Sequence, residues 1–377
     1  MKRFATVGAR FAGVALSLGV LLGCAGGAGK HKPADLPPDT GRLKWEQVWS
    51  SSLSNVAMPL TLRLVGQELA VAASDGSVAV FDVRSGVARW RSALDEEIAA
   101  GVGYDGRLAA VITLNNEVVV LDGGKEIWRQ RLSAQSLTAP LVAGQRVFVL
   151  GADRSVLAFD GMSGRRLWQQ QRAGEPLVLR QSGVLTAVGD TLIVGLSGKL
   201  AGLDPLNGSI RWEVAIAAPR GTNVVERLVD LVGDASRSGD VVCARAFQAA
   251  VGCVHAGRGA LLWTQPADGF VGLHGDAQSV YGVEADGTLL AWRRSSGENF
   301  WRMDKLRYRK LSQPWVAAEY VVVGDDEGRL HFLSREDGAT LARVPTDGSA
   351  LAAPPLQVDD MLVVVTRKGT LYGFKPL

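Results

Sequence analysis

The side chains able to do chemistry are few and scattered. Four histidines are present, with none of the short spacings of a metal site: His31, His255, His274 and His331. Gly195–Lys199 resembles the elbow that carries a catalytic serine, but it ends in lysine rather than glycine and its sequence indicates a hairpin. Gly26–Lys30 resembles a phosphate-binding loop, but a cysteine takes the place of the first glycine. We therefore expect no catalytic residue, no metal and no cofactor.

Two cysteines are placed for cross-strand pairing. Cys243 and Cys253 flank a predicted hairpin turn centred on Gln248. In an oxidising compartment such a pair can form a disulfide. The alternative is that the two cysteines are small buried thiols. The sequence leaves both alternatives open.

The third cysteine ends a secretion signal. Residues 1–10 carry three positive charges and no acid, and the apolar run Phe11–Leu22 is too short to span a bilayer. The run leads into Leu-Leu-Gly-Cys24, which resembles the bacterial lipobox, where cleavage before the cysteine is followed by attachment of diacylglycerol to its thiol. We predict a signal peptide over residues 1–23 and lipidation of Cys24. The alternative is an ordinary secretion signal with a chance cysteine.

The segment after Cys24 indicates where the anchor holds the protein. Residues 24–42 are rich in Gly and Pro and are predicted to be a flexible tether. Ala25 follows the cysteine, where an aspartate would favour retention in the inner membrane, so we expect the outer membrane and its periplasmic face. Without the three charges of the signal, the formal charge of +3 falls to zero, so we expect no nucleic-acid partner.

Residues 43–377 contain a repeat. Its clearest copy is Asp75–Trp90: a turn, an apolar strand, a second turn opening with Asp and closing with Gly, and a strand with Trp. Further copies are Glu117–Trp128, Arg154–Trp168, Gly198–Trp212, Ala249–Trp263, Gly287–Trp301, Gly328–Leu341 and Gly369–Phe374. The tryptophans are spaced by 41, 38, 40, 44, 51 and 38 residues, counted from Trp49, and about four short strands fit in each interval. We predict an all-β, eight-bladed β-propeller with four-stranded antiparallel blades.

The last copy of the repeat is incomplete. It stops after the apolar strand, while Val48-Trp49 supplies a Trp strand at the start of the body. We expect this N-terminal strand to pair into the last blade and close the ring, which removes an open sheet edge. The recurring Trp and Asp residues, including Asp82, Asp122, Asp160 and Asp204, are interpreted as packing and turn residues rather than ligand contacts, because they recur in nearly every unit.

The Asp-x-x-x-Gly-x-x-x-Trp unit resembles the repeat of pyrroloquinoline quinone (PQQ) propellers. With the lipobox, eight units and this length, the whole chain resembles the BamB family of outer-membrane assembly lipoproteins. That resemblance implies a non-enzymatic scaffold of the β-barrel assembly machinery, a monomer within a complex, which binds the POTRA domains of BamA and assists folding and insertion of outer-membrane proteins. Nascent outer-membrane proteins are then candidate further partners.

Two segments carry the more specific part of this resemblance. Leu177, Leu179 and Arg180 are similar to the Leu-x-Leu-Arg segment through which the family contacts BamA. Arg227 and Asp230 resemble its second contact loop, within the longest insertion of the repeat, although Val232 stands where the family tends to have a second Asp. We expect these five residues to bind the partner.

Two other functions are alternatives. One is a periplasmic propeller that binds a small ligand or a cell-wall component. The other is a relative of PQQ-dependent dehydrogenases, which the absence of a vicinal Cys-Cys pair disfavours.

Overall fold

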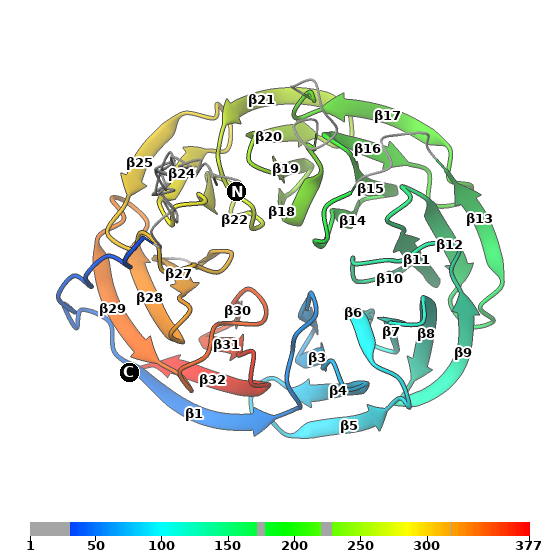
Figure 1. The fold of residues 1–377 in the computed structure, drawn as a ribbon, viewed down its shortest axis with the longest axis horizontal. Helices are drawn as coiled ribbons and strands as arrows, with labels where there is room; N and C mark the ends of the chain where they lie inside the picture. The colour runs from blue at the N-terminus through cyan, green and yellow to red at the C-terminus, as the bar shows by residue number, and fades with distance from the viewer. Residues whose placement is uncertain (1–30, 172–177, 220–227, 318) are drawn as a thin grey trace, which may run out of the picture. The chain divides into compact units, whose positions relative to one another are not determined.

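Eight antiparallel sheets of four strands each stand around a common axis (Figure 1). The computed structural model describes residues 31–171, 178–219, 228–317 and 319–377. The ring belongs to one compact unit, Pro33–Leu377. In seven of the sheets the chain runs from the innermost strand outward through neighbouring strands, and in the eighth the outermost strand comes from the start of the body. The prediction of an all-β, eight-bladed propeller is confirmed.

Blade 1 contains β2 (Arg63–Val65), β3 (Glu68–Ala72), β4 (Ser77–Asp82) and β5 (Ala88–Ala93), and blade 2 contains β6 (Ile98–Tyr104), β7 (Leu108–Thr113), β8 (Glu117–Asp122) and β9 (Lys125–Arg131). Blade 3 contains β10 (Leu141–Ala143), β11 (Arg146–Leu150), β12 (Val156–Asp160) and β13 (Arg166–Gln170), and blade 4 contains β14 (Leu185–Val188), β15 (Thr191–Leu196), β16 (Lys199–Leu203) and β17 (Ile210–Ala215).

Blade 5 contains β18 (Leu231–Ser238), β19 (Val241–Ala246), β20 (Ala250–His255) and β21 (Ala260–Pro266), and blade 6 contains β22 (His274–Gly275), β23 (Ser279–Val283), β24 (Leu289–Arg293) and β25 (Asn299–Met303). Blade 7 contains β26 (Trp315–Val316), β27 (Tyr320–Gly324), β28 (Arg329–Ser334) and β29 (Thr340–Pro345), and blade 8 contains β30 (Leu356–Val358), β31 (Met361–Val365), β32 (Thr370–Pro376) and β1 (Trp45–Ser52).

The eighth blade is closed by the start of the body. Its strand order is β1-β32-β31-β30, and Trp49 of β1 lies opposite Gly373 of β32. The predicted closure of the last blade by the N-terminal strand is therefore confirmed.

The two middle strands of each blade are buried on both faces, which explains their consecutive apolar residues. All of β7 is buried, as are the four central residues of β8. Val118 and Val120 of blade 2 belong to one core cluster with Val149 and Phe159 of blade 3. Neighbouring blades thus bury each other's faces, and the hydrophobic gain comes from contacts between blades.

Five of the repeated tryptophans hydrogen-bond one blade to the next. The indole Nε1 of Trp128 in blade 2 donates a hydrogen bond of 2.8 Å to the Gly161 carbonyl of blade 3. Its ring lies against Gly164, which has φ +68°, and a Cβ there would come within 2.6 Å of the indole. Trp49, Trp168, Trp263 and Trp301 make the same bond to the carbonyls of Val83, Pro205, Arg294 and Arg335. These indoles are structural.

The two ends of the ring differ. We call the end that carries the links between blades, such as residues 304–314, the connection face. The hairpin turns that lead from the second to the third strand of a blade lie there too, because Thr346, just after β29, bonds to Gly328 of such a turn. The opposite end carries the remaining turns, such as residues 334–340, and we call it the turn face.

Candidate functional site

Two of the links on the connection face are joined to each other. One lies between β13 and β14, and the other between β17 and β18. The Leu179 N–H of the first link donates a 3.0 Å hydrogen bond to Oδ2 of Asp230 in the second. Two residues that the sequence assigns to separate contact segments are therefore in direct contact. We call Leu179, Arg180 and Asp230 the two-link site.

A buried arginine that the sequence did not suggest lies beneath Asp230. Arg154, in the turn between β11 and β12, is 8% exposed and has φ +63°. Its Nη2 lies 3.9 Å from Asp230 Oδ1, and its Nε donates a 2.9 Å bond to Ser197 Oγ. The pattern gave no signal for Arg154 because it occupies an ordinary hairpin turn of its repeat. The carboxylate of Asp230 is thus held between the Arg154 guanidinium and the backbone N–H of Leu179.

Backbone pairing holds the two links in register. Gly183 and Val232 form an isolated antiparallel bridge, and Gly233 N–H donates a 2.8 Å bond to the Ser182 carbonyl. Leu231 N–H is bonded to the Ser197 carbonyl at 3.0 Å. The site therefore rests on backbone hydrogen bonds between blades 4 and 5, which limit the motion of the residues it presents.

The predicted contact residues differ in exposure. Leu179 is half-buried beside a small pocket of about 60 Å³, and Arg180 is exposed. Leu177 and Arg227 lie outside the described residues. An exposed guanidinium beside a half-buried leucine suits recognition of a protein surface, because Arg supplies a rigid fork of donors and Leu supplies apolar area.

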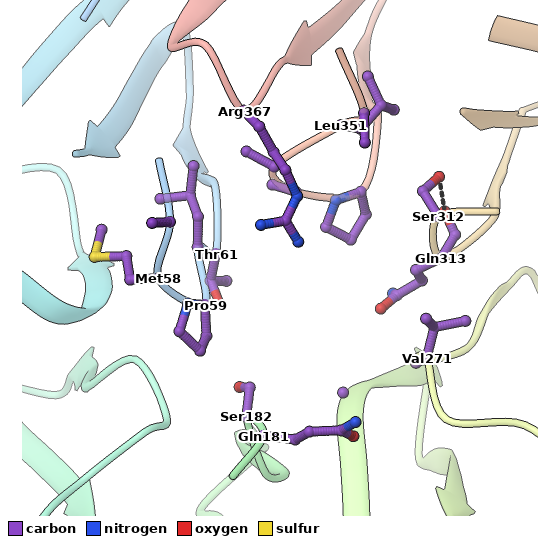
Figure 2. Close-up of a pocket in the computed structure, with 18 of the residues that line it drawn as sticks. Met58, Pro59, Thr61, Gln181, Ser182, Val271, Ser312, Gln313, Leu351 and Arg367 are labelled. Atoms are coloured by element: carbon purple, nitrogen blue, oxygen red, sulfur yellow. Dashed lines mark hydrogen bonds between the residues drawn. The ribbon is translucent and has the colours of Figure 1, made fainter. Parts of the chain in front are cut away.

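Beside Arg180 the connection face opens into a cavity of about 790 Å³ on the ring axis (Figure 2). Links from many blades line it, and the side chains shown include Met58, Thr61, Ser182, Gln313 and Arg367. We call it the axial cavity. Its lining mixes apolar groups with amides, hydroxyls and charges. Desolvation raises the pKa of Asp234 on its wall, and the charge of Arg63 opposes that rise.

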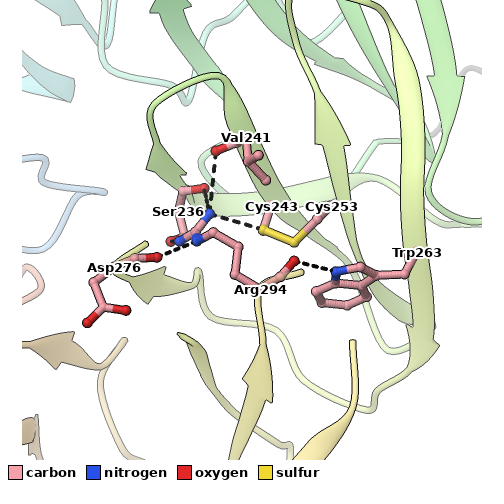
Figure 3. The surroundings of a disulfide bond; sticks show 7 residues. All are labelled: Ser236, Val241, Cys243, Cys253, Trp263, Asp276 and Arg294. Atoms are coloured by element: carbon pink, nitrogen blue, oxygen red, sulfur yellow. Dashed lines mark hydrogen bonds between the residues drawn. A yellow bond between two sulfur atoms is a disulfide. The ribbon is translucent and has the colours of Figure 1, made fainter. Parts of the chain in front are cut away.

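The sulfur atoms of Cys243 and Cys253 are bonded across directly paired positions of β19 and β20 (Figure 3). Arg294 of blade 6 covers the bond: its Nη1 lies 3.2 Å from Cys243 Sγ, and its Nη2 donates to Ser236 Oγ. Desolvation lowers the pKa of Arg294 to about 10, so its guanidinium stays charged at neutral pH. The disulfide is therefore enclosed at the seam between blades 5 and 6.

We predict that reducing this disulfide lowers the free energy of unfolding by about 3 kcal/mol, because a cross-link closing a short loop restricts the unfolded chain. Urea titrations of the Cys24→Ala chain with and without reductant measure the difference, and Cys243→Ala/Cys253→Ala gives the matched control that reductant leaves unchanged. Two free thiols counted in the unreduced Cys24→Ala chain would contradict the bond.

The part of the chain that the structure describes has neither a metal-binding cluster nor a membrane-spanning helix. Over residues 31–171, 178–219, 228–317 and 319–377, no three His, Cys, Asp or Glu side chains cluster closely enough for a metal ion. Nor does a helix within these ranges have the length and apolar character needed to cross a membrane.

Comparison with known proteins identifies the family. The family described as "Outer membrane protein assembly factor BamB" matches residues 29–97, 74–303 and 305–376. The chain belongs to the BamB family. The BamB of Burkholderia pseudomallei is 35% identical over 338 residues, which cover 89% of each chain. The crystal structure of BamB from Moraxella catarrhalis superposes with a TM-score of 0.80 at 23% identity, covering 88% of this chain and all of that one.

The propeller is also shared with quinone enzymes, but only as a fold. A quinohemoprotein alcohol dehydrogenase from Comamonas testosteroni has a TM-score of 0.68 at 15% identity, covering 89% of this chain and 77% of that one. Such a likeness does not extend to activity. Membership of the BamB family confirms the expectation that the chain is not an enzyme, since the family consists of assembly factors.

Proposed function

We propose that this protein is a lipid-anchored scaffold subunit of the outer-membrane β-barrel assembly machinery, binding the POTRA domains of BamA through the two-link site. In that role it assists folding and insertion of outer-membrane proteins. Lipidated Cys24 holds it at the periplasmic face of the outer membrane. Leu177 and Arg227 complete the contact.

The observation that carries this proposal is the hydrogen bond between Leu179 and Asp230. It fixes two links from different blade junctions as one surface. The Arg154 guanidinium below Asp230 supports the carboxylate, so the surface is prepared before a partner arrives. Preorganised groups of this kind bind with a smaller loss of conformational entropy. The family name of the relatives, which concerns outer-membrane protein assembly, supports the same role.

The experiment that tests the proposal is binding of the mature chain to the purified POTRA domains of BamA, measured by calorimetry or pull-down. We expect a specific complex that depends on the two-link site. Failure of the wild-type chain to bind the domains would overturn the proposal.

A second candidate function is binding of a small ligand or a cell-wall fragment in the axial cavity. The observation that favours it is the volume of about 790 Å³, which lies within the size range of ligand sites. Soluble peptidoglycan fragments added to the mature chain test it. If they bind with unchanged affinity after Leu179→Ser, at a residue of the two-link site that does not line the cavity, but lose affinity after Gln313→Ala, the ligand occupies the cavity independently of the two-link site.

A further inference from the structure

Residues 33–42, the later part of the predicted tether, lie along the outer side of blade 7, and we call them the strap. At its start, Ala34 N–H donates to the Arg307 carbonyl at 3.0 Å, and the Ala34 carbonyl accepts from Arg309 at 3.0 and 2.6 Å. Arg309 is only 7% exposed, so this end of the strap is bound by a buried guanidinium. Leu36 packs against the core cluster shared by blades 6 and 7.

The later residues of the strap follow β29. Arg343 donates to the Pro37 carbonyl at 2.9 Å through Nη2, and its N–H donates to Asp39 Oδ2 at 3.2 Å. Further along, Thr40 Oγ1 donates to the carbonyls of Thr340 and Leu341, and Arg42 N–H donates to Leu341 at 3.0 Å. The strap therefore covers the outer edge that β29 would otherwise leave open.

These contacts define the direction in which the strap runs between the two ends of the ring. Its start lies beside the link 304–314, on the connection face, and its end lies beside the first residues of β29, next to the turn 334–340 on the turn face. The chain then reverses, because Trp45 of β1 pairs with Pro376 at the turn-face end of β32. Without the strap, the chain before β1 would leave the ring from the turn face.

We propose that the strap transfers the attachment of the lipid anchor from the turn face to the connection face at blades 6 and 7, so that this face lies against the membrane. The inference rests on the lipidation of Cys24 in the proposed function. Residues 24–32 remain between the anchor and the strap, and such a segment reaches at most about 30 Å. If residues 33–42 were released from blade 7, the tether would extend as far as β1 and would join the ring at the turn face.

This arrangement places constraints on the partner. The two-link site also lies on the connection face, at blades 3 to 5, which blade 6 separates from blade 7 around the ring (Figure 1). Membrane and partner then approach the same face, and the partner domain must fit beside a lipid surface held within the reach of residues 24–32. A POTRA domain attached to a membrane-embedded barrel meets that condition.

The docking of the strap is tested first by amide hydrogen exchange of the mature chain in solution. We expect the amides of Ala34 and Arg42 to be protected, and Leu36→Ser/Thr40→Ala to remove that protection while the ring strands keep theirs. Pro38→Ala, at an exposed position of the same segment, is the matched control and should preserve it. Unprotected amides at Ala34 and Arg42 in the wild type would contradict the docking of the strap on blade 7.

The orientation is tested on vesicles, with Cys24 coupled to a maleimide lipid so that neither natural lipidation nor BamA is needed. A fluorescent amino acid replaces Lys305 on the connection face or Glu336 on the turn face, and both positions are exposed. We expect stronger energy transfer to a head-group acceptor from position 305, and loss of that difference in Leu36→Ser/Thr40→Ala. Equal transfer from both positions in the wild-type strap would overturn the orientation, whatever the outcome of POTRA binding.

Discussion

Replacing Glu284 by alanine is expected to lower the free energy of unfolding by roughly 3–5 kcal/mol, because it leaves a buried charge without its partner. The partner is Arg245 of blade 5, whose side chain is fully buried and whose Nη1 donates to Glu284 Oε1 at 3.0 Å. Desolvation lowers the pKa of Arg245, and the Glu284 carboxylate opposes that change. Because Glu284 follows β23 of blade 6, the pair also joins two blades.

Glu298→Ala is the matched control, since Glu298 pairs with Arg293 at 3.3 Å on the surface, with both side chains more than half exposed. That surface pair should contribute less than about 1 kcal/mol. Urea unfolding measures both variants. Addition of Arg245→Met to Glu284→Ala should recover part of the loss, because it removes the unpaired charge. A cost below about 1 kcal/mol for Glu284→Ala alone would contradict this account.

The second large effect concerns the membrane. With its own signal, the chain is expected in the outer-membrane fraction after a carbonate wash. With residues 1–24 replaced by a non-lipid secretion signal followed by alanine, it should appear in the soluble periplasmic fraction. The reason is that each buried methylene of an acyl chain contributes about 0.8 kcal/mol, so several chains anchor firmly and their loss removes the anchor.

The carbonate wash separates lipid anchoring from attachment through a protein partner, and mass spectrometry of the N-terminal peptide gives an independent measure of acylation at Cys24. Release of the wild-type chain by carbonate, together with an unmodified Cys24 peptide, would contradict the lipid anchor.

The fold was predictable because its cause is local and repeated. The turn, the two-face apolar strand and the Trp strand recur along the sequence, and each unit buries its faces only against a neighbour, so a ring follows. The displaced Trp49 strand also revealed the closure, which the pairing of β1 with β32 confirms. Neither inference required contacts between residues far apart in the sequence, except for the pairing of the first strand of the body with the last.

The candidate site was less accessible to sequence reasoning, because it depends on long-range contacts. Leu179 and Asp230 were each singled out, but their hydrogen bond spans 51 residues. Arg154 lies in a hairpin turn whose sequence gives no hint that it faces Asp230. The strap was missed for a related reason. Residues 33–42 have no strand alternation, and their binding to blade 7 depends on Arg309 and Arg343, which are far away in the sequence.

The most direct test of the central claim is the affinity of Arg180→Glu for the POTRA domains of BamA, compared with Arg258→Glu. Both positions are exposed and both changes reverse one charge, but Arg258 follows β20 on the turn face. We predict that Arg180→Glu weakens binding by about 30-fold or more, corresponding to a lost hot-spot contact of about 2 kcal/mol, while Arg258→Glu binds like the wild type. Wild-type affinity for Arg180→Glu, or an equal loss in both variants, would contradict binding through the two-link site.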